Sequence, residues 1–166
     1  MIAQWNNFGI KPIGRDSLPR KAEQRDTYKV KRTLPEPTLC PGCGAVFTEG
    51  QWQWRELSNA HESLCPACHR QQDNSPAGFI TISGDFVATH ETEILEIVHH
   101  EEQREKVEHP LKRVMNIEKL SGGFLVTTTD SHLARGIGEA LYQAYRGQLD
   151  FDSGPKDNLL LVHWHC

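Results

Sequence analysis

The chain has 166 residues, of which 37% are hydrophobic and 24% are charged, and its formal net charge is -4 at pH 7. This length has room for one ordinary domain and a small metal-stabilised module. No apolar stretch approaches the length that spans a bilayer, so no membrane role is expected, and the net charge taken alone argues against a nucleic-acid binder.

The first predicted part, residues 1–37, is a basic arm. Residues 1–39 hold eight Lys and Arg against four Asp and Glu, a net +4, whereas the remaining ten basic and 18 acidic residues give 40–166 a net -8. Four prolines and the lack of a sustained period predict an extended segment that folds on a partner. Its cations, interleaved with aromatic rings, suit RNA. The candidate RNA-binding residues here are Arg15, Arg20, Lys21, Arg25, Lys29, Lys31 and Arg32.

Two other interpretations of the arm stay open. A solvated, disordered terminus without function would show the same charge pattern. Its aromatic residues, Trp5, Phe8 and Tyr28, could also pack against the module that follows.

The second part, residues 38–75, contains two Cys-x-x-Cys pairs. Four thiolates at this separation suit tetrahedral Zn²⁺ in a closed structural site with no open position for a substrate. We therefore expect one structural zinc ion bound by Cys40, Cys43, Cys65 and Cys68.

Disulfides are the main alternative for these cysteines. No apolar signal peptide precedes them, which favours a reducing, cytoplasmic compartment and a metal. A redox motif is less suitable, because such a motif normally stands alone beside a βαβ pattern. His61 or His69 would replace a thiolate only if the four cysteines did not already fill the shell.

The pattern around the cysteines predicts a treble-clef or ribbon module. A hairpin is expected over 45–54, with Trp52 and Trp54 on one face of a strand, and a short helix over 69–73. Because few apolar residues are available, metal should supply most of the folding free energy, about 10 kcal/mol. Turn formers over 73–78 mark the boundary to the third part, residues 76–166.

The third part alternates strands and helices. We expect a strand over 79–83, a long helix over 85–107 stopped by Pro110, and a hairpin of strands 111–120 and 124–129. A helix over 131–146 and two strands over 148–151 and 159–164 complete the chain. This order is typical of a ferredoxin-like βαββαβ domain with one extra strand, in which two helices cover one face of an antiparallel sheet. The predicted fold class is therefore α+β.

No catalytic constellation stands out. Gly136 and Gly138 lie inside a helical pattern without a phosphate-binding lysine, so we interpret them as places where that helix closely approaches a neighbour. The corner over 127–132 could bind an anion at the start of the helix, and His132 and Arg135 there are further RNA-binding candidates, although ordinary helix capping also explains it. His163, His165 and Cys166 suggest either a second metal site or a free thiol at the end of the chain.

Several motifs follow one another along residues 38–166. They are Cys-Pro-x-Cys-Gly, Cys-Pro-x-Cys, the run 76–79, His90 with Glu93 and Ile94, and the distinctive run 123–130 followed by 132–134. In this combination the chain resembles the Nmd-three family of large-ribosomal-subunit adapters and its short bacterial relatives. The resemblance implies a protein that docks on the intersubunit face of the large subunit, with its cysteine-rich module against ribosomal RNA near the tRNA sites. Larger relatives carry further Cys-x-x-Cys pairs and domains, so an export role is not implied.

The leading hypothesis is thus a non-catalytic, zinc-dependent ribosome-binding factor of the cytoplasm, with the large subunit and its RNA as partners and no small-molecule substrate. Storage of idle ribosomes and assembly of new subunits stay open as roles. The alternative is a regulator that binds RNA polymerase through its zinc module. A third hypothesis, a metal-dependent hydrolase at the corner over 129–135, requires a second, open metal site.

Overall fold

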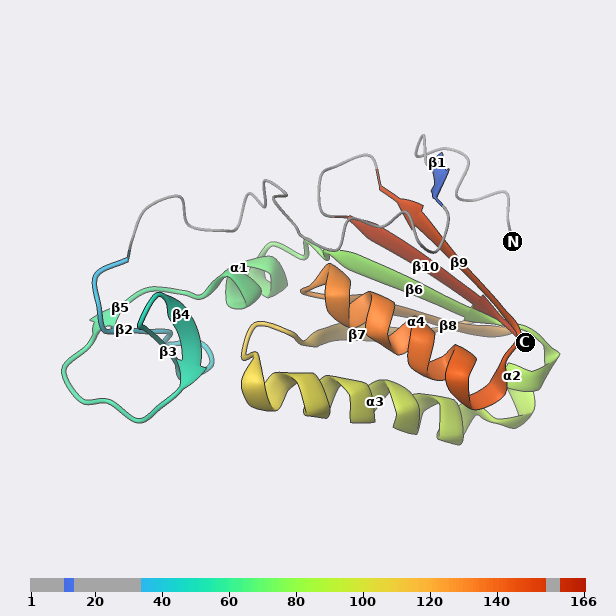
Figure 1. Ribbon diagram of the computed structural model, residues 1–166, viewed down its shortest axis with the longest axis horizontal. Coiled ribbons are helices and arrows are strands. Elements are labelled where there is room, and N and C mark those ends of the chain that lie inside the picture. The colour runs from blue at the N-terminus through green and yellow to red at the C-terminus, as the bar shows by residue number, and fades with distance from the viewer. Residues whose placement is uncertain (1–10, 14–33, 155–158) are drawn as a thin grey trace.

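Two β-sheets organise the chain in the computed structural model (Figure 1), which describes residues 11–13, 34–154 and 159–166. A four-stranded sheet has the order β4-β3-β2-β5, and a six-stranded sheet has the order β1-β9-β10-β6-β8-β7. The expected α+β class is confirmed, with the four cysteines at the small sheet. None of the helices in these described ranges is both long and apolar enough to cross a bilayer.

The small sheet contains the predicted hairpin. Its strands β3 (Ala45–Thr48) and β4 (Gln51–Trp54) pair antiparallel across a two-residue turn. Glu49 and Gly50 both adopt positive φ angles, 55° and 76°, which a turn of this length requires. The carboxylate of Glu36 accepts hydrogen bonds from both turn amides, at 2.9 and 3.0 Å.

Two short strands of this sheet were not predicted. They are β2 (Thr38–Leu39) and β5 (His61–Glu62), which pair in parallel. Each strand leads into one Cys-x-x-Cys pair, so their pairing brings the two cysteine pairs together. Strands of two residues carry no detectable period, which explains why the sequence pattern missed them.

The helix of the small module begins earlier than predicted. It is α1 (Pro66–Gln72), whereas the sequence pattern placed its start at His69. Cys65 caps it, because its sulfur accepts a hydrogen bond from the amide of Cys68, and Pro66 suits the first helical position.

The six-stranded sheet has β6 and β10 near its centre. Its strands are β1 (Lys11–Ile13), β6 (Gly78–Ser83), β7 (Val114–Leu120), β8 (Gly123–Thr128), β9 (Gln148–Ser153) and β10 (Leu160–His165). β6 pairs antiparallel with β8 but parallel with β10, which lies between β6 and β9. The expected all-antiparallel sheet is therefore wrong, and the sheet is mixed. The apolar run of β10, buried at Leu160, Val162 and Trp164, suits a central position better than the acidic β9 does.

Part of the basic arm is a strand rather than an irregular segment. β1 pairs antiparallel with β9 at the edge of the large sheet. Its middle residue, Pro12, has no amide hydrogen to donate, and proline within a sheet is confined to such edges.

The predicted helix over 85–107 is two helices. α2 (Asp85–Thr89) and α3 (Glu91–Glu108) are separated at His90, whose φ and ψ of -128° and 30° are not helical. The Thr89 hydroxyl donates to the carbonyl of Phe86 at 3.0 Å, and the His90 ring stacks on the Phe86 ring at 3.8 Å. These local side-chain contacts compete with continued helical bonding.

Helices α3 and α4 (Ser131–Tyr145) cover the same face of the large sheet (Figure 1). Helix α4 matches its predicted range closely, and Arg146, at φ 64°, ends it. The core between these helices and the sheet includes Ile94, Leu133, Ile137, Leu141, Ile80, Val126 and Trp164.

The strand predicted to begin at residue 111 starts at Val114 instead. The amide of Lys112 donates to the carbonyl of His109 at 3.0 Å, so the chain turns after Pro110 before it enters β7. This turn places Arg113 at the junction between the small module, residues 38–75, and the part of the chain from residue 76 onward that holds the large sheet and its helices, here called the body.

Candidate metal centre

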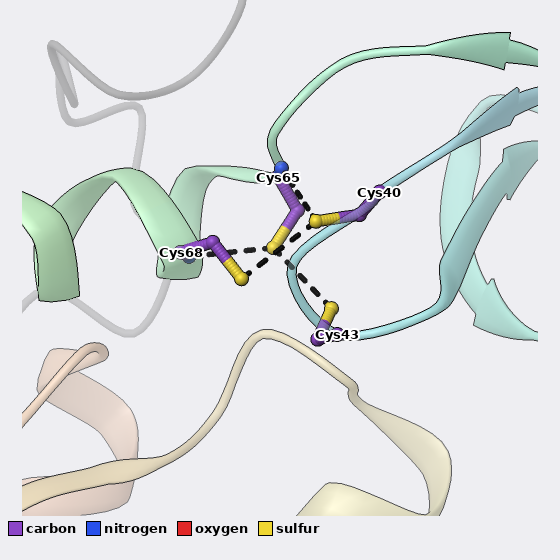
Figure 2. Close-up of side chains that lie close together, drawn as sticks. All are labelled: Cys40, Cys43, Cys65 and Cys68. Carbon is purple, nitrogen blue, oxygen red and sulfur yellow. Dashed lines mark hydrogen bonds between the residues drawn. The ribbon is translucent and has the colours of Figure 1, made fainter.

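The four cysteines of the two predicted pairs meet in one cluster (Figure 2). Their sulfur atoms all lie within 4.8 Å of one another. The Sγ atoms of Cys40 and Cys68 are 3.7 Å apart, and those of Cys43 and Cys65 are 3.8 Å apart. In the described part of the chain, these four residues form the group that is placed to hold a metal ion.

The sulfur spacing fits a tetrahedral metal site and not a pair of disulfides. Four sulfurs at about 2.3 Å from a central zinc ion are separated by about 3.8 Å, which matches the two distances above. A disulfide would require a separation of about 2.05 Å, and all five cysteines are free. The set of four thiols therefore suits zinc, and the ion it would hold has no open coordination position.

Local backbone conformation shapes the first pair. The amide of Gly44 donates to the carbonyl of Cys40 at 2.9 Å, and Gly44 has a φ of 82°, which favours glycine. A Cβ at Gly42 would lie 3.0 Å from the sulfur of Cys68, so a larger residue there would crowd the cluster.

Amide groups around the sulfurs shift the pKa values of the thiols. Burial acts to raise the pKa of Cys40, but backbone N–H groups of Cys65, Cys43 and Gly42 donate to its sulfur and lower its pKa to about 7. Burial raises the pKa of Cys43 and of Cys65. Metal binding therefore has to displace protons from some of these thiols near neutral pH, and metal affinity rises with pH.

Sequence analysis missed one residue of this centre, Arg113. Its Nη1 atom donates to the sulfur of Cys68 at 3.4 Å and its Nη2 atom to the sulfur of Cys65 at 3.3 Å. Nη1 also donates to the side-chain oxygen of Gln71 at 3.1 Å. No local pattern signals this role, because Arg113 lies 45 and 48 residues from the two cysteines in the sequence.

The environment keeps Arg113 charged although it is only 7% exposed. Burial acts to lower its pKa, but the hydrogen bond to Cys68 and the charges of the neighbouring thiols raise the pKa above its usual value. A buried guanidinium beside thiols favours their thiolate form, which is the form that binds metal.

The histidines considered as ligands lie outside the cluster. His61 is exposed on β5, and His69 is on α1 but is not among the four grouped ligands. At the end of the chain, His165 Nδ1 lies 3.1 Å from the Ser83 hydroxyl, His163 lies 3.6 Å from Asp152, and Cys166 Sγ lies 3.8 Å from the carbonyl of Tyr145. These three residues have separate partners.

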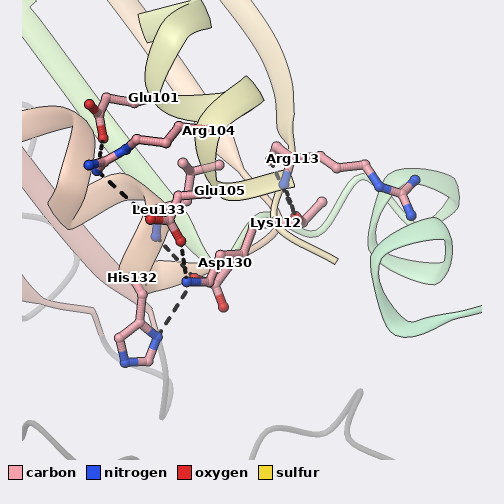
Figure 3. Close-up of polar contacts among 9 residues, drawn as sticks. Glu101, Arg104, Glu105, Lys112, Arg113, Asp130, His132 and Leu133 are labelled. Carbon is pink, nitrogen blue, oxygen red and sulfur yellow. Dashed lines mark hydrogen bonds and ion pairs between the residues drawn. The ribbon is translucent and has the colours of Figure 1, made fainter. Parts of the chain in front are cut away.

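The corner before α4 is a helix cap built on the body (Figure 3). Asp130 accepts a hydrogen bond from the amide of Leu133 at 3.0 Å, as expected for a capping residue. The hydroxyls of Thr128 and Thr129 donate to the carbonyls of Asp130 and Leu111, at 2.7 and 2.6 Å. They are therefore used to hold the backbone.

The two RNA-binding candidates of this corner have local partners. His132 lies 3.6 Å from the carboxylate of Asp130, and Arg135 lies 2.9 Å from that of Glu139. The guanidinium of Arg135 also lies over the ring of Phe151, 5.7 Å from its centre. The seven candidates of the arm, Arg15, Arg20, Lys21, Arg25, Lys29, Lys31 and Arg32, lie outside the described residues.

Fold and site together define an α+β protein with a four-cysteine candidate metal site. No family model matches the chain. No curated protein and no solved structure matches it significantly.

Proposed function

We propose that the protein is a non-catalytic, zinc-stabilised factor of the cytoplasm that binds the large ribosomal subunit through ribosomal RNA. The observation that carries the proposal is the division of charge between the basic arm and the acidic remainder of the chain, in which four cysteines form the candidate metal site. Storage of idle ribosomes and subunit assembly are both compatible with such a factor.

A structural role for the metal supports a binding function. Four cysteine ligands complete a tetrahedral shell, so the ion would have no free position at which to activate water or a substrate. Its contribution would be to hold the small sheet and α1 in a fixed shape.

Charge assigns the RNA contact to the arm rather than to the small module. Residues 34–77 contain two basic residues, Arg55 and Arg70, against five acidic ones, and Arg70 is buried. Residues 14–33 contain seven basic residues against three acidic ones. Phosphate contacts depend on Lys and Arg, so the arm would supply the affinity and the folded parts would supply position.

The finer fold assignments belong to this proposal. We assign the small module to the treble-clef or ribbon class because the hairpin β3–β4 follows the first cysteine pair and the helix α1 begins at the second. The body would be a ferredoxin-like domain in which the hairpin β9–β10 replaces the single last strand, so that β10 takes the place beside β6.

An RNA polymerase regulator is the second candidate. Helix α3 supports it, because exposed acidic residues such as Glu93, Glu96 and Glu108 lie along it and would repel RNA but attract a basic protein surface. In that case the protein would copurify with polymerase and not with ribosomes.

Sedimentation of ribosomes from the protein's own source tests the proposal. We expect the chain to sediment with large subunits at low salt and to move to the top of the gradient as salt rises. A variant in which the seven arm cations are changed to Gln should stay at the top even at low salt. The control variant Arg55→Gln with Lys119→Gln removes exposed cations of the folded parts, whose side chains are 48% and 68% exposed, and should sediment as the natural chain does. If the natural chain is found only at the top of a low-salt gradient, with ribosomes from both growing and starved cells, the proposal is contradicted.

A further inference from the structure

Arg113 crosses from the body to the metal centre. It precedes β7 of the large sheet, and its side chain reaches toward α1 of the small module (Figure 3). Both terminal nitrogens of its guanidinium donate to sulfurs of the second cysteine pair, at 3.4 Å to Cys68 and 3.3 Å to Cys65.

Hydrogen bonds within the body fix the position of this side chain. The amide of Arg113 donates to the hydroxyl of Thr129 at 2.9 Å, and its carbonyl accepts from the amide of Thr129 at 2.9 Å. Its Nε atom donates to the carbonyl of Pro110 at 2.9 Å. The guanidinium is therefore aimed at the cysteines by contacts that do not involve the small module.

Two further contacts join the same stretch of the body to the small module. Leu111 packs against the buried cysteine cluster. The indole nitrogen of Trp54, on β4, donates to the carbonyl of Lys106 at 2.7 Å. Residues 106–113 therefore form a contact segment for the module, with Arg113 as its charged member.

The acceptors of Arg113 are defined only while the four sulfurs are held together. A tetrahedral zinc site with four thiolates carries a net charge of about -2, which a buried guanidinium compensates. If the ion leaves, the two cysteine pairs are no longer bound to each other, and α1 with Cys65, Cys68 and Gln71 is no longer fixed opposite Arg113. The bond from Nε to the carbonyl of Pro110 would remain, but buried terminal nitrogens without acceptors are unfavourable, so the junction would open.

We propose that Arg113 is a positioning residue that ties the body to the metal centre, so that the placement of the two sheets relative to each other depends on bound metal. The proposal requires a metal at the four cysteines but does not require ribosome binding. Loss of the metal from the small module would then change the position of the large sheet relative to the small sheet.

The first test uses the full-length, zinc-loaded variant Arg113→Met, which keeps the apolar stem and removes every donor. Nuclear magnetic resonance can follow solvent exchange of the Trp54 indole N–H, which lies at the junction. We expect this exchange to become at least about tenfold faster. The indole N–H of Trp164 donates to the carbonyl of Arg146 at 2.8 Å inside the body and should not change. The control variant Arg104→Met removes an arginine whose side chain is 61% exposed and pairs with Glu101, and it should change neither signal.

A second readout examines the sulfurs directly with Co²⁺ in place of zinc. Hydrogen bonds from Arg113 stabilise the lone pairs of the two thiolates, which raises the energy of the sulfur-to-cobalt charge-transfer band. Arg113→Met should shift that band to longer wavelength, Arg113→Lys should shift it less, and Arg104→Met should leave it in place.

Zinc-loaded Arg113→Met that matches the natural chain in Trp54 exchange and in the cobalt band overturns the proposal. If the variant does not bind metal, the proposal is tested on the natural chain instead. Removal of its metal with a chelator should speed solvent exchange of the guanidinium protons of Arg113 while the amides of β6 and β8 stay protected. Unchanged exchange of these guanidinium protons after the metal has gone overturns the proposal as well. None of these tests measures sedimentation with ribosomes, so their results can be interpreted even if the protein does not bind ribosomes.

Discussion

Asp130 stabilises the start of α4 with a single side chain. Its carboxylate accepts from the amide of Leu133, one of the amides that a helix leaves unpaired at its first turn. We expect Asp130→Ala to lower the free energy of unfolding by about 1 kcal/mol, as measured by denaturant titration. Asp130→Asn keeps the acceptor and serves as the control, with a smaller loss. Equal losses for the two variants would mean that charge, and not the cap, is the source of the effect.

The same residue gives the stability a defined dependence on pH. Burial acts to raise the pKa of Asp130, but hydrogen bonding and charge from His132 and the Leu133 amide lower it overall. The folded state therefore binds this proton less readily than the unfolded state does, whose value is about 3.9. Its contribution is complete above that value and is lost as the pH falls through the lower folded value. Asp130→Asn should flatten the acid side of the stability curve, and an unchanged curve would contradict this assignment.

The cysteines of the cluster should differ from Cys166 in metal binding. Changes to residues around a metal's ligands typically reduce affinity by about 10- to 100-fold, so loss of a ligand in Cys43→Ser should reduce zinc affinity by more than about a hundredfold. Cys166→Ser is the matched control, because its sulfur lies beside the carbonyl of Tyr145 and outside the cluster. Competition with a coloured chelator measures both affinities. Equal affinity of the two variants would exclude the four-sulfur site.

At the scale of an element, the two glycines of α4 have different roles. A Cβ at Gly138 would lie 2.6 Å from Val162 and 3.1 Å from Leu149, whereas a Cβ at Gly136 would meet nothing closer than a carboxylate oxygen of Glu101 at 3.9 Å. The predicted close approach is therefore confirmed at Gly138, where the helix packs on β10, and is not needed at Gly136.

This difference predicts opposite effects of the same substitution. Gly138→Ala should destabilise the fold by about 1–3 kcal/mol, because the added methyl group overpacks a tight contact. Gly136→Ala should stabilise it by about 0.5–1 kcal/mol, because alanine loses less backbone entropy than glycine in a helix. Thermal and chemical unfolding of the two variants measures both changes. Two losses of similar size would show that the helix itself, and not its contact with Val162, needs glycine.

Elements with a long local period were predictable from the sequence. Helix α4 and the hairpin β7–β8 appear close to their expected ranges because apolar spacing and turn residues encode them locally. The position of β10 was not predictable, since pairing with β6 joins residues about 80 positions apart along the chain by register rather than by pattern. The break at His90 depends on a ring stacking on Phe86, which no hydrophobic period reveals.

The candidate metal site was likewise predictable only in part from the sequence. Spacing alone identified four cysteines, because metal ligands come in short, fixed intervals. Arg113 stayed hidden, because its partners come from a different part of the chain and its own neighbourhood looked like the start of a strand. Residues that support a metal centre from another module can be found only once the modules are placed together.

At the scale of the whole molecule, the two sheets are stabilised by different means. Among the residues that the structure describes, the large sheet and its helices enclose a core of fifteen buried residues, including Trp164 and Ile137. The buried cluster at the cysteines of the small module consists of Cys40, Cys65 and Ala67, with a few partly buried neighbours, and β3 adds two buried residues, Ala45 and Val46. A core of that size cannot offset the conformational entropy of its chain, so we expect a metal ion to stabilise the small module.

Removal of the metal should therefore unfold one part of the molecule and spare the other. We expect the chelated protein to keep one cooperative thermal transition, that of the body, and to lose the unfolding enthalpy of the small module. At about 0.7 kcal/mol per residue, roughly 40 residues correspond to a loss of about 30 kcal/mol in calorimetry. Because Arg113 and Trp54 join the two parts, the remaining transition should also fall by a few degrees, as the body loses a contact that only the folded module supplies. A chelated protein with its full unfolding enthalpy would mean that the small module folds without metal, whereas loss of every transition would mean that the body depends on the metal for its own fold.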